Sequence, residues 1–258
     1  MSEPANEPVT QGWDSITTFV DDRWIERRPR RPGVSRRLRL ETELLPWLAD
    51  RLPLRIPEPF VANDEPLVVR HERVVGEPLT QLDEAAGRAL ANFLRQLHGT
   101  NLNAATGHGL PSAEASLSSR ADTIRRFHDT VVPLLPEELR SQANALLEEL
   151  ESAPADTVVH SDLGPEHILC TRNTISGVID FGAVQTGDPA IDLSWALCNT
   201  PPEFAAAVAE HYDPPIEVRQ RARLWHQLGP WYEVVHGQDQ CLPGYIASGL
   251  RGVLNRLR

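Results

Sequence analysis

The sequence contains no lysine, and this absence limits the chemistry that the chain can use. Apart from histidine, all 25 of its basic side chains are arginines. A guanidinium group is planar and always charged, whereas an ammonium group is compact, so arginine does not replace lysine without changing the geometry of a site. Any phosphate contact that usually falls to lysine must therefore be made by arginine here.

Cysteine is scarce, and long apolar runs are missing. Cys170, Cys198 and Cys241 are odd in number and widely spaced. This excludes a disulfide framework or a metal knuckle and favours reduced thiols. No apolar run approaches the length of a membrane span. Residues 1–12 are polar and acidic, unlike a secretory signal peptide. We therefore expect a cytoplasmic protein with no membrane partner.

The composition is that of an ordinary globular protein with an acidic balance. The chain has 258 residues, with 36 acidic against 25 basic side chains and a net charge of −11. This charge argues against a nucleic-acid partner. It is compatible with a cationic small-molecule substrate, and equally with a simple role in solubility. We expect a monomer or a weak dimer that acts on a small molecule.

The order of predicted elements indicates an α+β fold with two lobes. Short strands are predicted over residues 14–20, 23–28, 67–69 and 73–75, and a helix over 38–52. The eight arginines of residues 23–39 are interpreted mainly as a solvated basic edge. Helices are predicted over 80–99, 114–129 and 136–152, and most of the remainder is helical. We place a nucleotide-binding lobe at residues 1–74 and a catalytic, substrate-binding lobe at 75–258.

The most informative segment is residues 157–195, which carries two aspartates at strand ends. Asp162 follows the apolar pair Val158–Val159, and Asp180 ends the second strand of a hairpin, before Gly182. Phosphoryl transfer needs one carboxylate to accept the hydroxyl proton and another to hold the metal on the nucleotide. A lone loop aspartate is usually a turn or cap residue, but the paired spacing favours catalysis.

This segment resembles the catalytic block of the aminoglycoside phosphotransferase family, whose fold is similar to that of protein kinases. The family pattern is H-x-D-x-x-x-x-N, then I-D-[FW], then G-D-P-x-x-D. Here the corresponding residues read HSDLGPEH over 160–167, IDF over 179–181 and GDPAID over 187–192. The loop is most similar to those of aminoglycoside 2″-kinases and macrolide 2′-kinases. Several motifs at consistent spacing are far more specific than any one of them.

The resemblance implies a role for each matching residue. It implies that Asp162 is the catalytic base and that Asp180 and His167 hold Mg²⁺ on ATP or GTP. It also implies that Arg27, paired with Glu41, contacts the α- and β-phosphates. The backbone near Val74, in the hinge segment, would then meet the nucleotide base.

Two further aspartates have structural interpretations. Asp188 precedes a proline at the start of a predicted helix, as a helix N-cap does. Asp192, one turn into that helix, is expected to brace the catalytic loop. Trp225, Trp231 and Tyr232 lie at helical spacing and are interpreted as core residues. Acidic residues near them, Glu233 and Asp239, could instead meet a cationic sugar.

The sequence departs from the family pattern at three places. His167 replaces an asparagine, although Mg²⁺ prefers oxygen ligands, so it either serves the metal or phosphate side or fills a polar gap. Arg27 stands where many relatives have lysine. No glycine-rich loop precedes Arg27, so phosphate cover would come from a turn near residues 11–15.

Three functional hypotheses remain at this stage. The first is a kinase that transfers the γ-phosphate of ATP or GTP to a hydroxyl of an aminoglycoside, a macrolide or a related antibiotic. The second is a metabolite kinase of the same fold. The third is a catalytically silent pseudokinase that binds nucleotide, which the three departures favour and the retention of Asp162 and Asp180 opposes.

Overall fold

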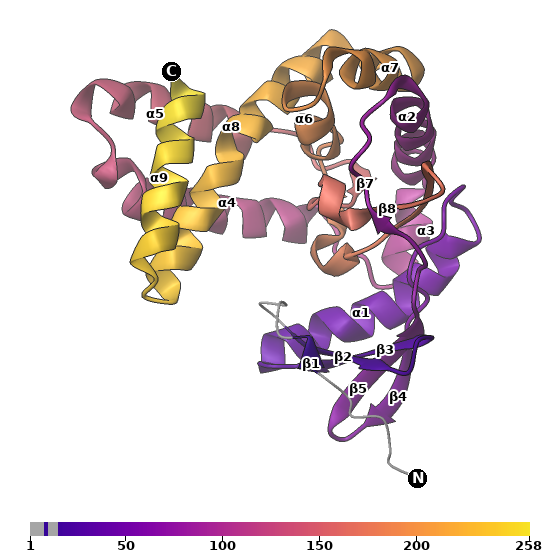
Figure 1. Cartoon of the computed structure of the whole chain (residues 1–258). Coiled ribbons are helices and arrows are strands. Elements are labelled where there is room, and N and C mark those ends of the chain that lie inside the picture. The colour runs from indigo at the N-terminus through magenta and orange to yellow at the C-terminus, as the bar shows by residue number, and fades with distance from the viewer. Residues whose placement is uncertain (1–7, 10–14) are drawn as a thin grey trace.

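The computed structural model describes residues 8–9 and 15–258, in a small sheet followed by a mainly helical region (Figure 1). The strands are β1 Pro8–Val9, β2 Ser15–Val20, β3 Trp24–Pro29, β4 Phe60–Asp64, β5 Leu67–Glu72, β6 Glu77–Pro78, β7 Thr157–Val159, β8 Ile168–Thr171, β9 Thr174–Val178 and β10 Gln185–Gly187. The α-helices are α1 Pro32–Ala49, α2 Glu84–His98, α3 Leu102–Gly107, α4 Ala113–Thr130, α5 Glu137–Glu151, α6 Ala190–Cys198, α7 Pro202–Tyr212, α8 Ile216–Asp239 and α9 Pro243–Leu257. Short 3₁₀ turns are η1 Val132–Leu134, η2 Pro165–His167 and η3 Phe181–Ala183.

The N-terminal lobe is an antiparallel sheet with one long helix against it. The strand order is β1-β2-β3-β5-β4, and β3 pairs with both β2 and β5. Val34 and Leu38 of α1 form a buried cluster with Leu67 and Val69 of β5. This packing fixes α1 across the sheet, so that the middle of α1 faces β3 (Figure 1).

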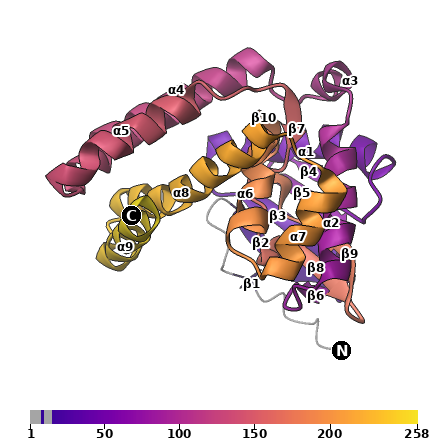
Figure 2. The same ribbon diagram turned by 90° about the horizontal axis from the view of Figure 1, so that it is seen from above.

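The C-terminal lobe is a helical assembly around one large apolar core. Leu90, Phe93, Leu94 and Leu97 of α2 recur at helical spacing and are completely buried, as predicted from their periodicity. Helix α8 packs against α6 at one end and α9 at the other, and Figure 2 shows it running between these two groups. Helices α4 and α5 lie to one side of α8 (Figures 1 and 2).

Two small sheets hold the loops that carry the predicted site. β7 pairs with β10, and the loop over residues 160–164 leaves the end of β7. β8 pairs with β9 and β6, and Asp180 follows two residues after β9. The α+β architecture predicted from the sequence, with a small strand-rich lobe and a larger helical lobe, is therefore confirmed.

A strip of two backbone hydrogen bonds connects Arg55, in the linker after α1, to strand β9 of this hairpin. The Arg55 amide donates to the Ser176 carbonyl at 3.4 Å, and the Arg55 carbonyl accepts from Val178 at 2.9 Å. A side chain on Gly177 would collide with Val74 and with the Arg55 carbonyl, because an added Cβ would lie 2.4 and 2.8 Å from them. Gly177 is therefore required for this close approach.

Several predicted boundaries were wrong. Helix α1 begins at Pro32 instead of residue 38, because Pro32 at its first turn starts the helix within the arginine-rich segment. Residues 73–75 are not a strand, since β5 ends at Glu72. β4 was not predicted, because all of its side chains are exposed and give no alternating pattern. The predicted start of the first strand at Asp14 lies outside the described residues, as does nearly all of the predicted phosphate-covering turn.

Within the described residues, no helix combines the length and the apolar character needed to cross a bilayer. This agrees with the absence of long apolar runs in the sequence.

Buried histidines predict that the protein loses stability in mild acid. Burial lowers the pKa of His71, although its bond to the Glu72 carbonyl opposes this shift. Burial likewise lowers the pKa of His160, and partial burial lowers the pKa of His226. As the pH falls through 6.5, the unfolded chain therefore binds protons that the folded chain does not, and the free energy of unfolding decreases. Urea unfolding at pH 7.5 and 5.5 measures this slope. His71→Gln should reduce the slope, and an unchanged slope would contradict the assignment.

Candidate functional site

The structure brings Asp162, His167 and Asp180 together at the open end of the β8–β9 hairpin. One ligand atom from each lies within 4.8 Å of the others. His167 Nε2 is 3.6 Å from Asp180 Oδ2, and His167 Nδ1 is 3.9 Å from Asp162 Oδ2. The Asp162 and Asp180 side chains are 65% and 50% exposed. Two carboxylates and one imidazole thus converge at a place that a ligand can reach.

The backbone conformation of Asp180 and the surroundings of Asp162 set the properties of the two carboxylates. Asp180 has φ +64° and ψ +59°, a left-handed conformation that aspartate tolerates better than most residues. The sharp exit from the strand is thus made by Asp180 itself. Partial burial raises the pKa of Asp162, nearby Asp180 raises it further, and His167 opposes this shift. A raised pKa brings a carboxylate closer to the range useful for accepting a proton.

Hydrogen bonding fixes the orientation of His167. Its Nδ1 lies 2.6 Å from the carbonyl oxygen of Asp162. A carbonyl oxygen only accepts, so Nδ1 carries the proton and donates. In the neutral ring Nε2 then has a lone pair, which faces Asp180. The second ring nitrogen of His167 thus lies near the Asp180 carboxylate.

Arg27 and Glu41 form a nearly buried ion pair between β3 and α1. Arg27 Nη1 lies 2.5 Å from Glu41 Oε2, and the two side chains are 18% and 3% exposed. Burial raises the pKa of Glu41, and Asp180 adds to this shift, while Arg27 opposes it. Glu41 Oε1 has no partner among the described residues. The pairing predicted from the sequence is present.

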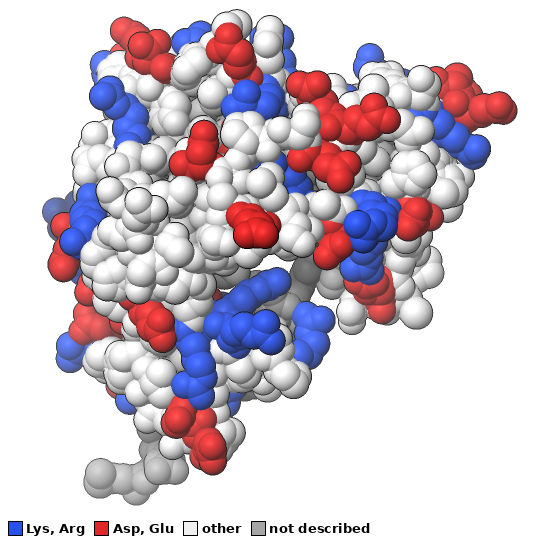
Figure 3. Space-filling model, turned by 180° about the vertical axis from the view of Figure 1, so that it is seen from behind, with Lys and Arg blue, Asp and Glu red and all other residues white. Residues whose placement is uncertain are grey.

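The arginine–glutamate pair lies beside Asp180. A Cβ added to Gly182 would be 3.4 Å from Asp180 Oδ1, 3.9 Å from Arg27 Nη2 and 4.0 Å from Glu41 Oε1. Gly182 therefore marks the point where groups from both lobes meet. Figure 3 shows basic side chains along a recess between the lobes, consistent with a site for an anion.

The backbone of Val74 is available in the segment between the lobes. Its side chain is buried against Gly177, whereas neither its amide nor its carbonyl is hydrogen-bonded to another described residue. The neighbouring Val75 carbonyl accepts from the Ser176 hydroxyl at 3.0 Å. Val74 does not touch the aspartate cluster, so the predicted base contact is a separate part of the cleft.

Asp192 braces the loop that carries Asp162, as predicted. Its carboxylate accepts from the amides of His160 and Ser161, both at 2.8 Å, and from His98 Nε2 at 3.0 Å. His98 Nδ1 in turn lies 2.8 Å from the Tyr212 hydroxyl. Asp192 is 1% exposed. Burial alone would raise its pKa, but the bond and charge of His98 outweigh burial and lower the pKa.

Buried His160 fixes the start of the loop from inside. Its Nε2 lies 2.9 Å from the Ile179 carbonyl, so Nε2 donates, and Nδ1 accepts from the Asp162 amide at 3.3 Å. Both ring nitrogens are therefore occupied. The backbone of Asp162 is held by His160 on one side and by His167 on the other.

Asp188 has a larger structural role than the predicted helix cap. The N-cap of α6 is Pro189, so the prediction was wrong by one residue, although the Asp188 carboxylate accepts from the Ala190 amide at 3.1 Å. It also forms a two-point ion pair with Arg221 at 2.7 and 3.0 Å and accepts from Trp225 Nε1 at 3.0 Å. These partners lie more than thirty positions along the chain, and sequence reasoning missed them because no local pattern marks them.

Asp188→Ala is expected to destabilise the protein by about 3–5 kcal/mol, because Arg221 would lose its partner in a largely buried place. The Asp188 side chain is 0% exposed and that of Arg221 is 19% exposed. Chemical denaturation measures the effect. Asp129→Ala, on an exposed stretch of α4, is the control, and an equal loss for both variants would contradict this role.

The aromatic residues of α8 have different environments. Trp225 and Trp231 are 8% and 0% exposed, which confirms them as core residues. Tyr232 is 50% exposed, so its assignment to the core was wrong. Asp239 forms an ion pair with Arg126 of α4. Of the acidic side chains suggested for a cationic sugar, Asp239 is thus already neutralised.

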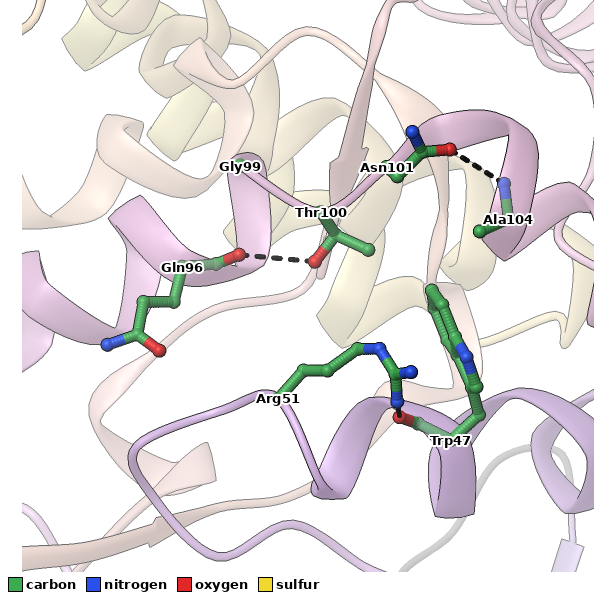
Figure 4. A pocket seen from close by; sticks show the side chains of 7 residues that line it. All are labelled: Trp47, Arg51, Gln96, Gly99, Thr100, Asn101 and Ala104. Carbon is green, nitrogen blue, oxygen red and sulfur yellow. Dashed lines mark hydrogen bonds between the residues drawn. The ribbon is translucent and has the colours of Figure 1, made fainter.

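A separate open pocket lies where the ends of α1 and α2 meet (Figure 4). The Arg51 guanidinium lies 4.2 Å from the centroid of the Trp47 ring, and the Thr100 hydroxyl donates to the Gln96 carbonyl at 3.1 Å. Asn101 caps α3 through the Ala104 amide at 2.9 Å. These groups satisfy one another, and the pocket includes none of the predicted site residues.

The fold is that of kinase-like phosphotransferases of known structure. A GDP and kanamycin complex of an APH(2″) protein superposes with a TM-score of 0.83 at 22% identity, covering 99% of this chain and 94% of that chain. A macrolide 2′-phosphotransferase from Brachybacterium faecium superposes with a TM-score of 0.73 at 20% identity, covering 96% and 90%. At this level of identity the likeness concerns the fold.

The sequence identifies the family. Residues 6–226 match the model of the phosphotransferase enzyme family, so the chain belongs to that family. Viomycin phosphotransferase from Streptomyces vinaceus is 30% identical over 184 residues, covering 61% of this chain and 63% of the relative. A homoserine kinase from Granulibacter bethesdensis is 34% identical over 129 residues, covering 50% and 36%. The chain thus matches less than two thirds of the length of either relative.

Proposed function

We propose that this protein is a small-molecule kinase that transfers the γ-phosphate of ATP or GTP to a hydroxyl group of an antibiotic. The observation that carries this proposal is the convergence of Asp162, His167 and Asp180 within 4.8 Å, next to the Arg27–Glu41 pair. Phosphoryl transfer depends mainly on positioning and on neutralising phosphate charge, and these groups supply both.

Asp162 is proposed as the base that orients and deprotonates the acceptor hydroxyl. Its carboxylate is exposed at the recess, while its backbone is held by bonds to His160 and His167. The acceptor would approach from the side of α4 and α8, where Tyr232 offers an exposed ring. As the acceptor oxygen bonds to the γ-phosphorus, the bond from that phosphorus to the bridging oxygen of the β-phosphate breaks. ADP or GDP then leaves, and the hydroxyl proton passes to the Asp162 carboxylate.

Arg27 is proposed to hold the α- and β-phosphates. Nη1 is engaged by Glu41, whereas Nη2 makes no hydrogen bond to a described residue and lies toward Asp180. Glu41 thus fixes the guanidinium and leaves one edge for a phosphate oxygen. We propose the lobe boundary at residues 74 and 75, so that the free backbone groups of Val74 meet the nucleotide base.

The residues around Asp180 also fit a divalent cation. Carboxylate oxygens suit Mg²⁺, and the lone pair of His167 Nε2 faces the same point. When bound, Mg²⁺ would neutralise charge on the nucleotide phosphates. Asp180 and His167 are the residues proposed to hold it, and Asp180 is expected to contribute more because it offers oxygen.

The antibiotic class follows from the relatives. One relative is named for viomycin, and a structural neighbour was solved with kanamycin. The net charge of −11 suits cationic acceptors of this kind. We further propose that the protein acts in the cytoplasm, where nucleotides and reduced thiols occur together.

A phosphoryl-transfer assay tests the proposal. Purified protein is incubated with ATP or GTP, with and without Mg²⁺, against viomycin, kanamycin, other aminoglycosides, macrolides and homoserine. We expect an acceptor whose mass increases by one phosphate group and whose modification requires the cation. Homoserine is included to test for metabolite phosphorylation, because the second relative is named as a homoserine kinase. Nucleotide binding without transfer to any acceptor would favour the pseudokinase.

Arg27→Met should lower kcat/KM for the nucleotide by roughly 10²-fold, because one charge-assisted phosphate contact is lost and Glu41 is left unpaired. Arg27→Lys should recover much of this loss, since an ammonium group can reach phosphate even without the two-pronged geometry. Arg30→Met is the matched control on the solvated basic edge. Equal activity of Arg27→Met and wild type would exclude the phosphate role.

A further inference from the structure

His167 presents a nitrogen where the aminoglycoside phosphotransferase pattern has an oxygen-bearing asparagine. The 2.6 Å bond from Nδ1 to the Asp162 carbonyl fixes the tautomer. In the neutral ring Nε2 is then an acceptor, and it lies 3.6 Å from another acceptor, Asp180 Oδ2. Two acceptor atoms facing each other at this distance repel unless a proton or a cation lies between them. The arrangement is therefore suited to a bound cation.

The chemistry of the donor atoms decides which cation suits the site. Mg²⁺ is hard and prefers oxygen, whereas imidazole nitrogen binds the later first-row cations more strongly. In the Irving–Williams order even Mn²⁺, the weakest binder of its series, accepts mixed nitrogen and oxygen ligands. A site with carboxylate oxygens and one imidazole nitrogen therefore discriminates less against Mn²⁺ than an all-oxygen site does.

We infer that His167 shifts the cation preference of the proposed nucleotide site from Mg²⁺ toward Mn²⁺. The inference rests on the proposed kinase function, because it concerns the same cation site. It depends on one residue only. The nearest other imidazole, His160, is buried, and both of its nitrogens are bonded to backbone groups of Ile179 and Asp162. Among the residues that the structure describes, His167 is therefore the histidine that can offer a nitrogen ligand at this site.

Competition between Mn²⁺ and Mg²⁺ tests the inference without measuring turnover. Free Mn²⁺ is followed by electron paramagnetic resonance with the full-length protein and ADP or GDP in separate runs, while Mg²⁺ is added. Replacing the imidazole in His167→Asn should lower the ratio of Mn²⁺ to Mg²⁺ affinity by about tenfold. His128→Asn, an exposed histidine on α4, should keep the wild-type ratio. Equal ratios in His167→Asn and wild type would overturn the inference.

Nitrogen coupling to bound Mn²⁺ gives a direct signature. With ¹⁵N-labelled histidine and unlabelled nucleotide, pulsed electron paramagnetic resonance should show one ¹⁵N coupled to Mn²⁺ in wild type and none in His167→Asn. Bound Mn²⁺ without ¹⁵N coupling in wild type would show that His167 is not a ligand. The wild-type spectrum can be interpreted even if His167→Asn folds poorly. Thermal melting of His167→Asn checks whether that variant is folded.

The two proposals can fail separately. If wild type transfers phosphate with Mg²⁺ but its cation ratio equals that of His167→Asn, only the cation preference is wrong. If wild type binds neither cation in the presence of ADP or GDP and transfers no phosphate, the kinase function is wrong and the cation preference falls with it. Asp180→Asn should weaken both cations together, because it removes an oxygen ligand.

Discussion

Asp162→Asn should lower kcat for phosphoryl transfer by about 10²–10⁴-fold, the usual contribution of a general base. The amide is almost the same size as the carboxylate, but it cannot accept the hydroxyl proton. The Asp162 backbone should stay in place, because its amide bonds to His160 and its carbonyl accepts from His167. KM for the nucleotide should therefore change little.

The control for Asp162→Asn is Glu166→Gln. Glu166 is an exposed carboxylate on the same loop and adds to the negative charge near Asp162. The Glu166→Gln substitution removes one nearby charge but leaves the proposed base intact. Its kcat should therefore stay within about threefold of wild type. Steady-state kinetics with the acceptor found in the transfer assay measures both variants. Full activity of Asp162→Asn would exclude Asp162 as the proton acceptor.

Asp192→Asn is expected to lower the free energy of unfolding by about 3–5 kcal/mol, as much as Asp188→Ala. The carboxylate accepts three hydrogen bonds at a position that is 1% exposed. An amide group would direct N–H groups at donors that now point to oxygen, and a buried donor without an acceptor is costly. Urea denaturation measures this loss.

The same variant should also lower kcat, because Asp192 holds the amides of His160 and Ser161 immediately before Asp162, the proposed base. A displacement of about 1 Å in such a loop costs roughly 10²-fold in rate. Kinetics well below the melting temperature separate this effect from unfolding. Asp213→Asn, at a side chain that is 88% exposed, is the matched control. A stable but fully active Asp192→Asn would show that the loop keeps its position without this brace.

The sequence was sufficient to predict the elements in which the spacing of apolar residues or of motifs is itself informative. Helix α2 was predicted from leucines and a phenylalanine at helical spacing, and all of them are buried. The catalytic loop was predicted because several motifs occur together at consistent spacing. The pairing of Arg27 with Glu41 followed from the family resemblance, and the structure contains it.

Other features could not be predicted, because they depend on contacts between distant residues. β4 has no buried side chain, so its sequence has no alternating pattern, and it is a strand because β5 pairs with it. Asp188 looks like a simple helix cap, and only the folded chain brings Arg221 and Trp225 to it. The hydrogen bonds from His98 to Asp192 and Tyr212 likewise join three helices.

The strip that joins Arg55 to the β9 strand limits how the two lobes can move. Its hydrogen bonds lie at the back of the cleft, with the Val75 carbonyl bonded to Ser176 beside them. If the two lobes are joined along this line of hydrogen bonds, the easiest motion of one lobe relative to the other is a hinge rotation about that line. Displacement then increases with distance from the axis, so β4 would swing widely while Arg27 shifts less. Nucleotide entry would therefore require no broken bond at the strip, and the Val178 amide should stay protected from hydrogen exchange throughout the cycle.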